Sequence, residues 1–154
     1  MEINDIEYQC WHEVGHAVAC MLQKGEVVSI ELSDNKSNPY LARASCKTPT
    51  RDMKLATSAG GFAIEYALFI SNKLNNIKEK EFLTEAIQNS SQDRDKFCSN
   101  ENLTEDMCEK IFIDYAKQLS EDFLQMMDKL EKIVIQLMKK KKLTGNQIVN
   151  IFNS

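Results

Sequence analysis

Apolar residues recur with a helical period over the first part of the chain and again over most of its second half. A first helix is predicted from a cap at Asn4 or Asp5 to about Lys24, before the stop signal Gly25. Its apolar positions are Ile6, Cys10, Val14, Ala17, Val18, Met21 and Leu22. The β-branched run Val27–Leu32 and the segment Tyr40–Lys47 predict two short strands separated by turn residues. We therefore expect a small sheet beside the first helix.

A second long helix is predicted over Thr50–Asn72, where apolar residues again follow a helical period. Small residues lie inside both long helices, at Gly15 in the first and at Gly60 and Gly61 in the second. Glycine inside a helix costs about 1 kcal/mol relative to alanine, so these positions indicate that another backbone comes close.

The rest of the chain is predicted to be helical, with turns between short and long segments. Ser90 or Ser91 can cap a short helix that carries Asp93 and Asp95 in its first turn. The other predicted helices are Lys80–Ile87, Thr104–Leu119, Ser120–Lys141 and Thr144–Phe152. We expect residues 1–154 to form a single domain of the α+β class that is mainly α, with a sheet of two or three strands.

The charge balance restricts the function. A net charge of −4 argues against a general binder of nucleic acid or of anionic membranes. The run Lys139–Lys142 is interpreted as a solvated helix end rather than a nucleic-acid patch. No stretch of about 18 apolar residues is present, and the first residues do not resemble a signal peptide. Five cysteines without a C-x-x-C pair suit reduced thiols, so we expect a soluble cytoplasmic protein.

Candidate chemistry is concentrated in the segment His12-Glu13-Val14-Gly15-His16, which contains both histidines of the chain. Residues four apart on a helix lie one turn above each other, so the two imidazoles can share one metal ion. Glu13 points about 100° away from His12 and can flank the same ion. The pattern H-E-x-x-H is typical of zinc hydrolases, in which the histidines bind zinc and the glutamate is the general base. The alternative is a pair of helix histidines with ordinary hydrogen bonds.

A catalytic zinc ion usually has three protein ligands, so one ligand must come from elsewhere. Cys20 lies eight residues from His12, a rise of about 12 Å, which is too far to share the ion. Ala19 and Leu22 occupy the positions of the glycine and the third histidine in the longer H-E-x-x-H-x-x-G-x-x-H motif. A carboxylate from another helix is the best remaining ligand. The candidates are Glu65, Glu85, Asp93 and Asp95, and periodicity does not choose among them.

Several segments resemble one protein family. HEVGHAVA is similar to the zinc-binding helix of the FtsH-type AAA zinc metalloproteases, and VVSIEL with YLARASCKTP resembles the strand region of that peptidase domain. The segment Ala56–Glu65 is similar to the family's LGG-x-x-AEE helix, and LMKKKKLTGNQIVNIF to its final helices. SSQDRDK occupies the place of the family's GA-x-ND segment, whose aspartate is the third zinc ligand. The best register places Asp93 there and leaves Asp95 as the alternative.

The resemblance implies a zincin-like peptidase domain without the ATPase module or membrane anchor. Its Zn²⁺ would be held by His12, His16 and Asp93, with Glu13 as the catalytic base. Glu65 would contact and orient one of the zinc-binding histidines without binding the metal itself. The alternative is that Glu65 only pairs with a nearby Lys or Arg. Tyr40–Cys46 would bind an extended substrate strand or serve only as structure.

We expect an ATP-independent metallopeptidase that acts on peptides or unfolded protein. A separate unfoldase could supply its substrates. The protein could also form a homo-oligomer. The alternative from a different class is a zinc-stabilised interaction or regulatory module that does not cleave its partner.

Overall fold

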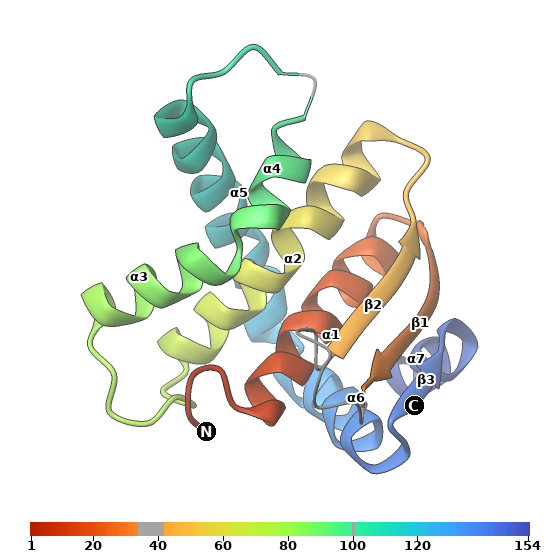
Figure 1. Ribbon diagram of the computed structural model, residues 1–154. Coiled ribbons are helices and arrows are strands. Elements are labelled where there is room, and N and C mark those ends of the chain that lie inside the picture. The colour runs from red at the N-terminus through yellow and green to blue at the C-terminus, as the bar shows by residue number, and fades with distance from the viewer. Residues whose placement is uncertain (34–41, 100) are drawn as a thin grey trace.

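The computed structural model describes residues 1–33, 42–99 and 101–154, and these residues form seven helices and three strands. The helices are α1 (Ile6–Leu22), α2 (Arg51–Ile70), α3 (Glu79–Asn89), α4 (Ser91–Phe97), α5 (Glu105–Gln125), α6 (Met127–Lys140) and α7 (Gly145–Phe152). The strands are β1 (Glu26–Leu32), β2 (Ala42–Lys47) and β3 (Lys142–Thr144). The predicted class, mainly helical with a small sheet, is confirmed (Figure 1). The predicted start of the second strand at Tyr40 lies outside the described residues.

Side-chain caps fix the starts of the long helices. Asp5 accepts a hydrogen bond from the backbone N–H of Tyr8 at 2.7 Å, which confirms the predicted start of α1. Thr50 and Thr104 cap α2 and α5 in the same way, each through its hydroxyl oxygen. Ser90 precedes α4, but its hydroxyl is buried without a hydrogen-bond partner and makes no cap.

Helices α1 and α2 lie side by side at the centre of the molecule, with the sheet and α6 against α1 and the remaining long helix α5 against α2. A Cβ atom on Gly15 would lie 2.4 Å from the carbonyl oxygen of Gly60, and the reverse distance is the same. The two backbones therefore touch at this point, as the interior glycines predicted. Because α1 and α2 are fixed at such close range, side chains on their facing surfaces are held at defined separations.

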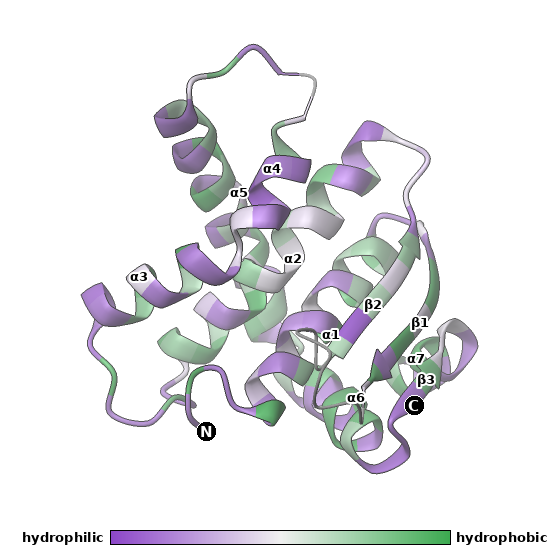
Figure 2. Ribbon diagram, in the orientation of Figure 1, coloured by the Kyte–Doolittle hydropathy of each residue, from purple (hydrophilic) through white to green (hydrophobic). Residues whose placement is uncertain are grey.

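The sheet is antiparallel with the strand order β2-β1-β3. Its third strand, β3, lies where the sequence predicted only a turn between the last two helices. Leu143 pairs with Ile30 of β1, and both side chains are fully buried. Strand β2 is an edge strand that runs beside α1. Figure 2 shows hydrophobic residues along β1 and hydrophilic ones along the outer helices α3 and α4.

The predicted helix boundary at Ser120 is wrong, because α5 continues to Gln125. Ser120 looked like a cap in the sequence, but its hydroxyl donates to the carbonyl oxygen of Lys117 at 2.5 Å inside the continuous helix. The helix ends instead at Met126, which has no capping side chain. The described part of the chain holds no helix long and apolar enough to cross a membrane.

The prediction that the cysteines are all reduced thiols is also wrong. Cys98, which follows α4, forms a disulfide with Cys108 in the first turn of α5. Their Cα atoms are 6.0 Å apart, a separation that suits a disulfide. A spacing of ten residues along the chain does not disclose this approach, which depends on how α4 packs against α5. Cys10, Cys20 and Cys46 are free thiols.

Candidate metal centre

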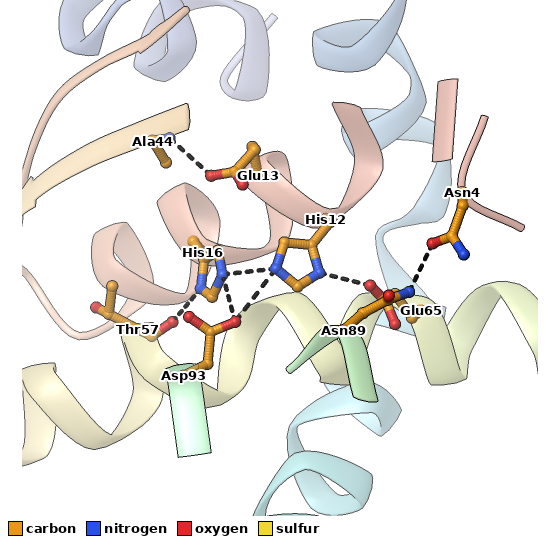
Figure 3. A network of polar contacts seen from close by, with 9 residues as sticks. All are labelled: Asn4, His12, Glu13, His16, Ala44, Thr57, Glu65, Asn89 and Asp93. Atoms are coloured by element: carbon orange, nitrogen blue, oxygen red, sulfur yellow. Dashed lines mark hydrogen bonds and ion pairs between the residues drawn. The ribbon is translucent and has the colours of Figure 1, made fainter. Parts of the chain in front are cut away.

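Helix α1 presents the two histidines to α2, and each Nδ1 atom has an acceptor there. His12 Nδ1 lies 2.5 Å from the Glu65 carboxylate, and His16 Nδ1 lies 2.6 Å from the carbonyl oxygen of Thr57. Both partners accept hydrogen bonds, so in the neutral form of each ring Nδ1 carries the proton and Nε2 keeps its lone pair. The two Nε2 atoms face each other at 2.9 Å (Figure 3).

The carboxylate of Asp93, on α4, contacts the Nε2 atoms of both histidines. Its Oδ2 atom lies 3.2 Å from Nε2 of His12 and 3.2 Å from Nε2 of His16. Asp93 is in the first turn of α4, which packs against α2, so the contact depends on two helix packings. Figure 3 shows Asp93 reaching toward both rings from α4.

The three atoms fit a zinc ion. In a tetrahedral site with bonds of about 2.0–2.1 Å, ligand atoms are about 3.3 Å apart. The observed separations of 2.9–3.2 Å are close to this value. Two lone pairs facing each other at 2.9 Å also repel unless a proton or a cation lies between them. The donor set, two imidazoles and a carboxylate, is one that zinc accepts in catalytic sites.

The close contacts among His12, His16 and Asp93 shift the pKa values of all three side chains. Burial lowers the pKa of His12, but the Glu65 carboxylate and a hydrogen bond with Asp93 outweigh it and raise the pKa well above the usual value. For His16, burial is likewise outweighed by Asp93. Burial raises the pKa of Asp93, but the two histidines bring it well below its usual range. The positively charged forms of the histidines and the carboxylate of Asp93 therefore stabilise one another.

Glu13 lies beside the two histidines rather than between them. One of its carboxylate oxygens is within 4.8 Å of a ring nitrogen of each histidine. Its Oε2 atom accepts a hydrogen bond of 2.7 Å from the backbone N–H of Ala44 on β2. Because Asp93 is closer to the two rings, Asp93 is the better third ligand and Glu13 is left as a carboxylate next to the centre.

A buried carboxylate and a buried phenol lie behind His12. Glu65 is 1% exposed, and its Oε2 atom has no hydrogen-bond partner. The hydroxyl of Tyr8 is also buried without a partner, and it lies near enough to Glu65 that burial and this carboxylate raise the pKa of Tyr8. Sequence reasoning missed Tyr8. Its position four residues before His12, on the same helix face, was the signal available.

The other acidic candidates lie elsewhere. Asp95 is exposed on α4, and the carboxylate of Glu85 accepts a hydrogen bond from Asn4. Glu65 contacts the back of His12 and not the Nε2 side. The structure therefore brings Asp93 to the histidines, in the register that the resemblance favoured.

An open cavity of about 740 Å³ lies over this centre and has the size of a ligand-binding cleft. Its lining comes from α1, β2, α2, α3 and α4 and includes both histidines, Glu13, Glu65 and Asp93. Cys46 also lines the cavity, and its hydrogen bond with the neighbouring Cys20 lowers the pKa of the Cys20 thiol. The candidate site is thus accessible and has free space beside the atoms that could bind a metal.

No protein-family model matches the sequence, and no curated protein is significantly similar to it.

Proposed function

We propose that this protein is a zinc-dependent metallopeptidase with a zincin-like site of the FtsH peptidase type. The observation that carries the proposal is the convergence of three atoms, Nε2 of His12, Nε2 of His16 and Oδ2 of Asp93, within 2.9–3.2 Å of one another. These three residues would hold Zn²⁺. When bound there, zinc supplies Lewis acidity, which makes a water molecule a nucleophile near neutral pH and polarises a peptide carbonyl.

The residues around the ligands support hydrolysis. Glu13 is the proposed general base: it takes a proton from the attacking water and delivers it to the leaving amine. The hydrogen bond from Ala44 to Oε2 holds this carboxylate in place and leaves Oε1 as the atom that exchanges the proton. Glu65 keeps His12 in the tautomer that exposes Nε2, as carboxylates behind zinc-bound histidines do.

Strand β2 supports a mode of substrate binding. It is an edge strand and lines the cavity through residues 42–44 and 46. An extended peptide can add to such an edge by backbone hydrogen bonds, which binds substrates with little dependence on side chains. This places the proposed substrates among peptides and unfolded segments.

The first experiment measures metal binding. Zinc content and chelator competition are compared for the wild type, Asp93→Asn and Asp95→Asn. The two aspartates are two residues apart on the same short helix, so Asp95→Asn is a matched control for charge and position. We expect one zinc ion per chain, at least tenfold weaker binding in Asp93→Asn and unchanged binding in Asp95→Asn. Equal zinc affinity in the two variants would exclude Asp93 as a ligand.

The second experiment measures cleavage of a mixed peptide library and of an unfolded protein by the zinc-loaded chain. We expect Glu13→Gln to keep its zinc and lose cleavage by at least 100-fold, because general base catalysis contributes about 10²–10⁴-fold. Glu7→Gln, on the same helix, is the control. A zinc-loaded wild type that is as inactive as Glu13→Gln on all substrates would contradict the peptidase proposal. The non-catalytic zinc module would then be the better description.

A further inference from the structure

Three basic residues line the cavity: Arg43 of β2, Lys54 of α2 and Lys96 of α4. Contacts between α1 and α2 pair His12 with Glu65 and His16 with Thr57, so the helices run in opposite directions along the cavity. Asn4 therefore lies beyond His12, where it accepts a hydrogen bond from Asn89 (Figure 3). Lys54 lies beyond His16, one turn before Thr57.

Lys96 of α4 lies near Lys54 at the same end. The hydroxyl of Ser99 accepts a hydrogen bond from Nζ of Lys54 and donates one of 2.9 Å to the carbonyl oxygen of Lys96. Both lysines line the cavity. Two lysines from different helices therefore line the end of the cleft beyond His16.

These cations have no carboxylate partner among the residues that the structure describes. Neighbouring basic residues do: Arg51 pairs with Glu101 at 2.8 Å, and Arg94 pairs with Glu109 at 2.9 Å. The acidic residues that line the cavity are all at its centre and are engaged there. They are Glu13, which accepts from Ala44, and Glu65 and Asp93, which contact the histidines.

The rest of the chain makes this end unusual, since the protein carries a net charge of −4. A divalent ion at the centre would offset most of the charge of the three central carboxylates. The field at the cavity end beyond His16 would then be set by Lys54 and Lys96, and the walls of a cleft concentrate such a field.

We propose that Lys54 and Lys96 form a subsite that recognises an acidic side chain of the substrate. This inference rests on the proposed peptidase function. Thr57 is beside His16, and Lys54 lies about 4.5 Å further along the helix. An extended peptide covers about 3.3 Å per residue. The preferred Asp or Glu therefore lies within about three residues of the cleaved bond, and only on the side that faces the lysines.

The test uses peptides of one length and sequence in which a single position is Asp, Asn or Lys, scanned through three residues on each side of the cleaved bond. We expect kcat/KM to be on the order of tenfold higher for Asp than for Asn at one or two positions on one side. The preference should weaken as salt rises from 0.05 to 0.5 M, because the lysines are accessible to solvent.

Charge-reversed protein provides the second arm. Lys54→Glu with Lys96→Glu should prefer Lys over Asp at the same positions, and alanine at both should abolish the preference without reversing it. The control is Lys110→Glu with Lys132→Glu, which changes the net charge equally at exposed positions outside the cavity lining. The control should keep the preference for Asp. Thermal denaturation of each variant shows whether it is folded.

The outcomes separate the two proposals. Cleavage without a preference for Asp, or a preference that survives charge reversal, overturns the acidic subsite and leaves the peptidase intact. Binding of the same fluorescent peptides to Glu13→Gln is measured in parallel by anisotropy. Tighter binding of the Asp peptide by Glu13→Gln, without cleavage by any variant or the wild type, supports the subsite and contradicts the peptidase. Equal binding of all peptides without cleavage contradicts both.

Discussion

Replacing Gly15 by alanine should separate α1 from α2 and thereby damage the metal centre. The new Cβ atom would lie 2.4 Å from the carbonyl oxygen of Gly60 and 2.6 Å from Cγ2 of Ile64. Carbon and carbonyl oxygen atoms normally approach to about 3.3 Å. The helices must therefore move apart locally by about 0.9 Å, since the closest obstacle is backbone and cannot rotate away.

The expected loss of stability follows from two opposing effects. Overpacking in a well-packed core costs about 1–3 kcal/mol, and a backbone clash belongs at the upper end of this range. Alanine also stabilises the folded protein by about 1 kcal/mol, because its helix propensity is higher than that of glycine. The net loss is about 2 kcal/mol. For a chain of this length that corresponds to a decrease in Tm of about 4–8 °C.

The same movement should weaken zinc binding. His12 is on α1 and Glu65 on α2, and their contact of 2.5 Å cannot survive a displacement of about 0.9 Å without adjustment. Loss of such a partner behind a zinc ligand typically lowers metal affinity 10- to 100-fold. We expect about tenfold for Gly15→Ala.

Thermal denaturation in EDTA measures the first effect, and competition with a zinc chelator measures the second. Thr84→Ala, at an exposed position of α3, is the control for helix propensity without a clash. A Gly15→Ala protein with an unchanged or higher Tm and native zinc affinity would refute the reasoning. It would mean that α1 and α2 do not pack at backbone contact.

Three further predictions concern the centre and the helix that carries Asp93. Glu65→Gln keeps an acceptor for His12 but removes the negative charge, so chelator competition should show about tenfold weaker zinc binding. Circular dichroism should show little change in fold. Native zinc affinity in this variant would exclude the proposed role of Glu65 in orienting His12. In EDTA, the raised pKa of His12 stabilises the protein fully below about pH 6.5, and this stabilisation is lost as pH rises through the folded-state pKa. The lowered pKa of Asp93 stabilises the protein above about pH 4, and this stabilisation is lost as pH falls. Urea unfolding of the metal-free protein should therefore show higher stability near pH 5.5 than near pH 8.5, and a zinc-saturated sample that shows the same trend would contradict metal binding by deprotonated histidines. Reducing the Cys98–Cys108 disulfide should lower the free energy of unfolding by about 3 kcal/mol, because a crosslink with a separation of ten residues restricts the unfolded chain by about this much. An unchanged urea midpoint after reduction would contradict this prediction.

The sequence by itself determined most of the local structure. Helix starts at Asp5, Thr50 and Thr104 follow from side chains that can accept a hydrogen bond from the next turn, which is a property of neighbouring residues. The interior glycines predicted the contact between α1 and α2, because a glycine is retained in a helix where a side chain does not fit. The pairing of His12 and His16 follows from helix geometry alone.

Local signals failed at three places in the chain. Ser120 has the residue type of a cap, but it bonds to the carbonyl oxygen of Lys117 within a continuous helix, so the predicted boundary was wrong. Leu143 lies in a segment that looked like a connector, and it becomes a strand only because β1 offers a free edge. The disulfide of Cys98 with Cys108 depends on the packing of α4 against α5.

The tertiary structure alone decided how the candidate centre is completed. Asp93 and Asp95 have the same charge and nearly the same position in the chain, but they point in different directions, and only the packing of α4 on α2 turns one of them toward the histidines. Tyr8 and Glu65 are 57 residues apart in number, so no local pattern could join them. Periodicity fixes the face of a helix on which a residue lies, whereas the rotation of one helix against another is set by the packing of the whole core.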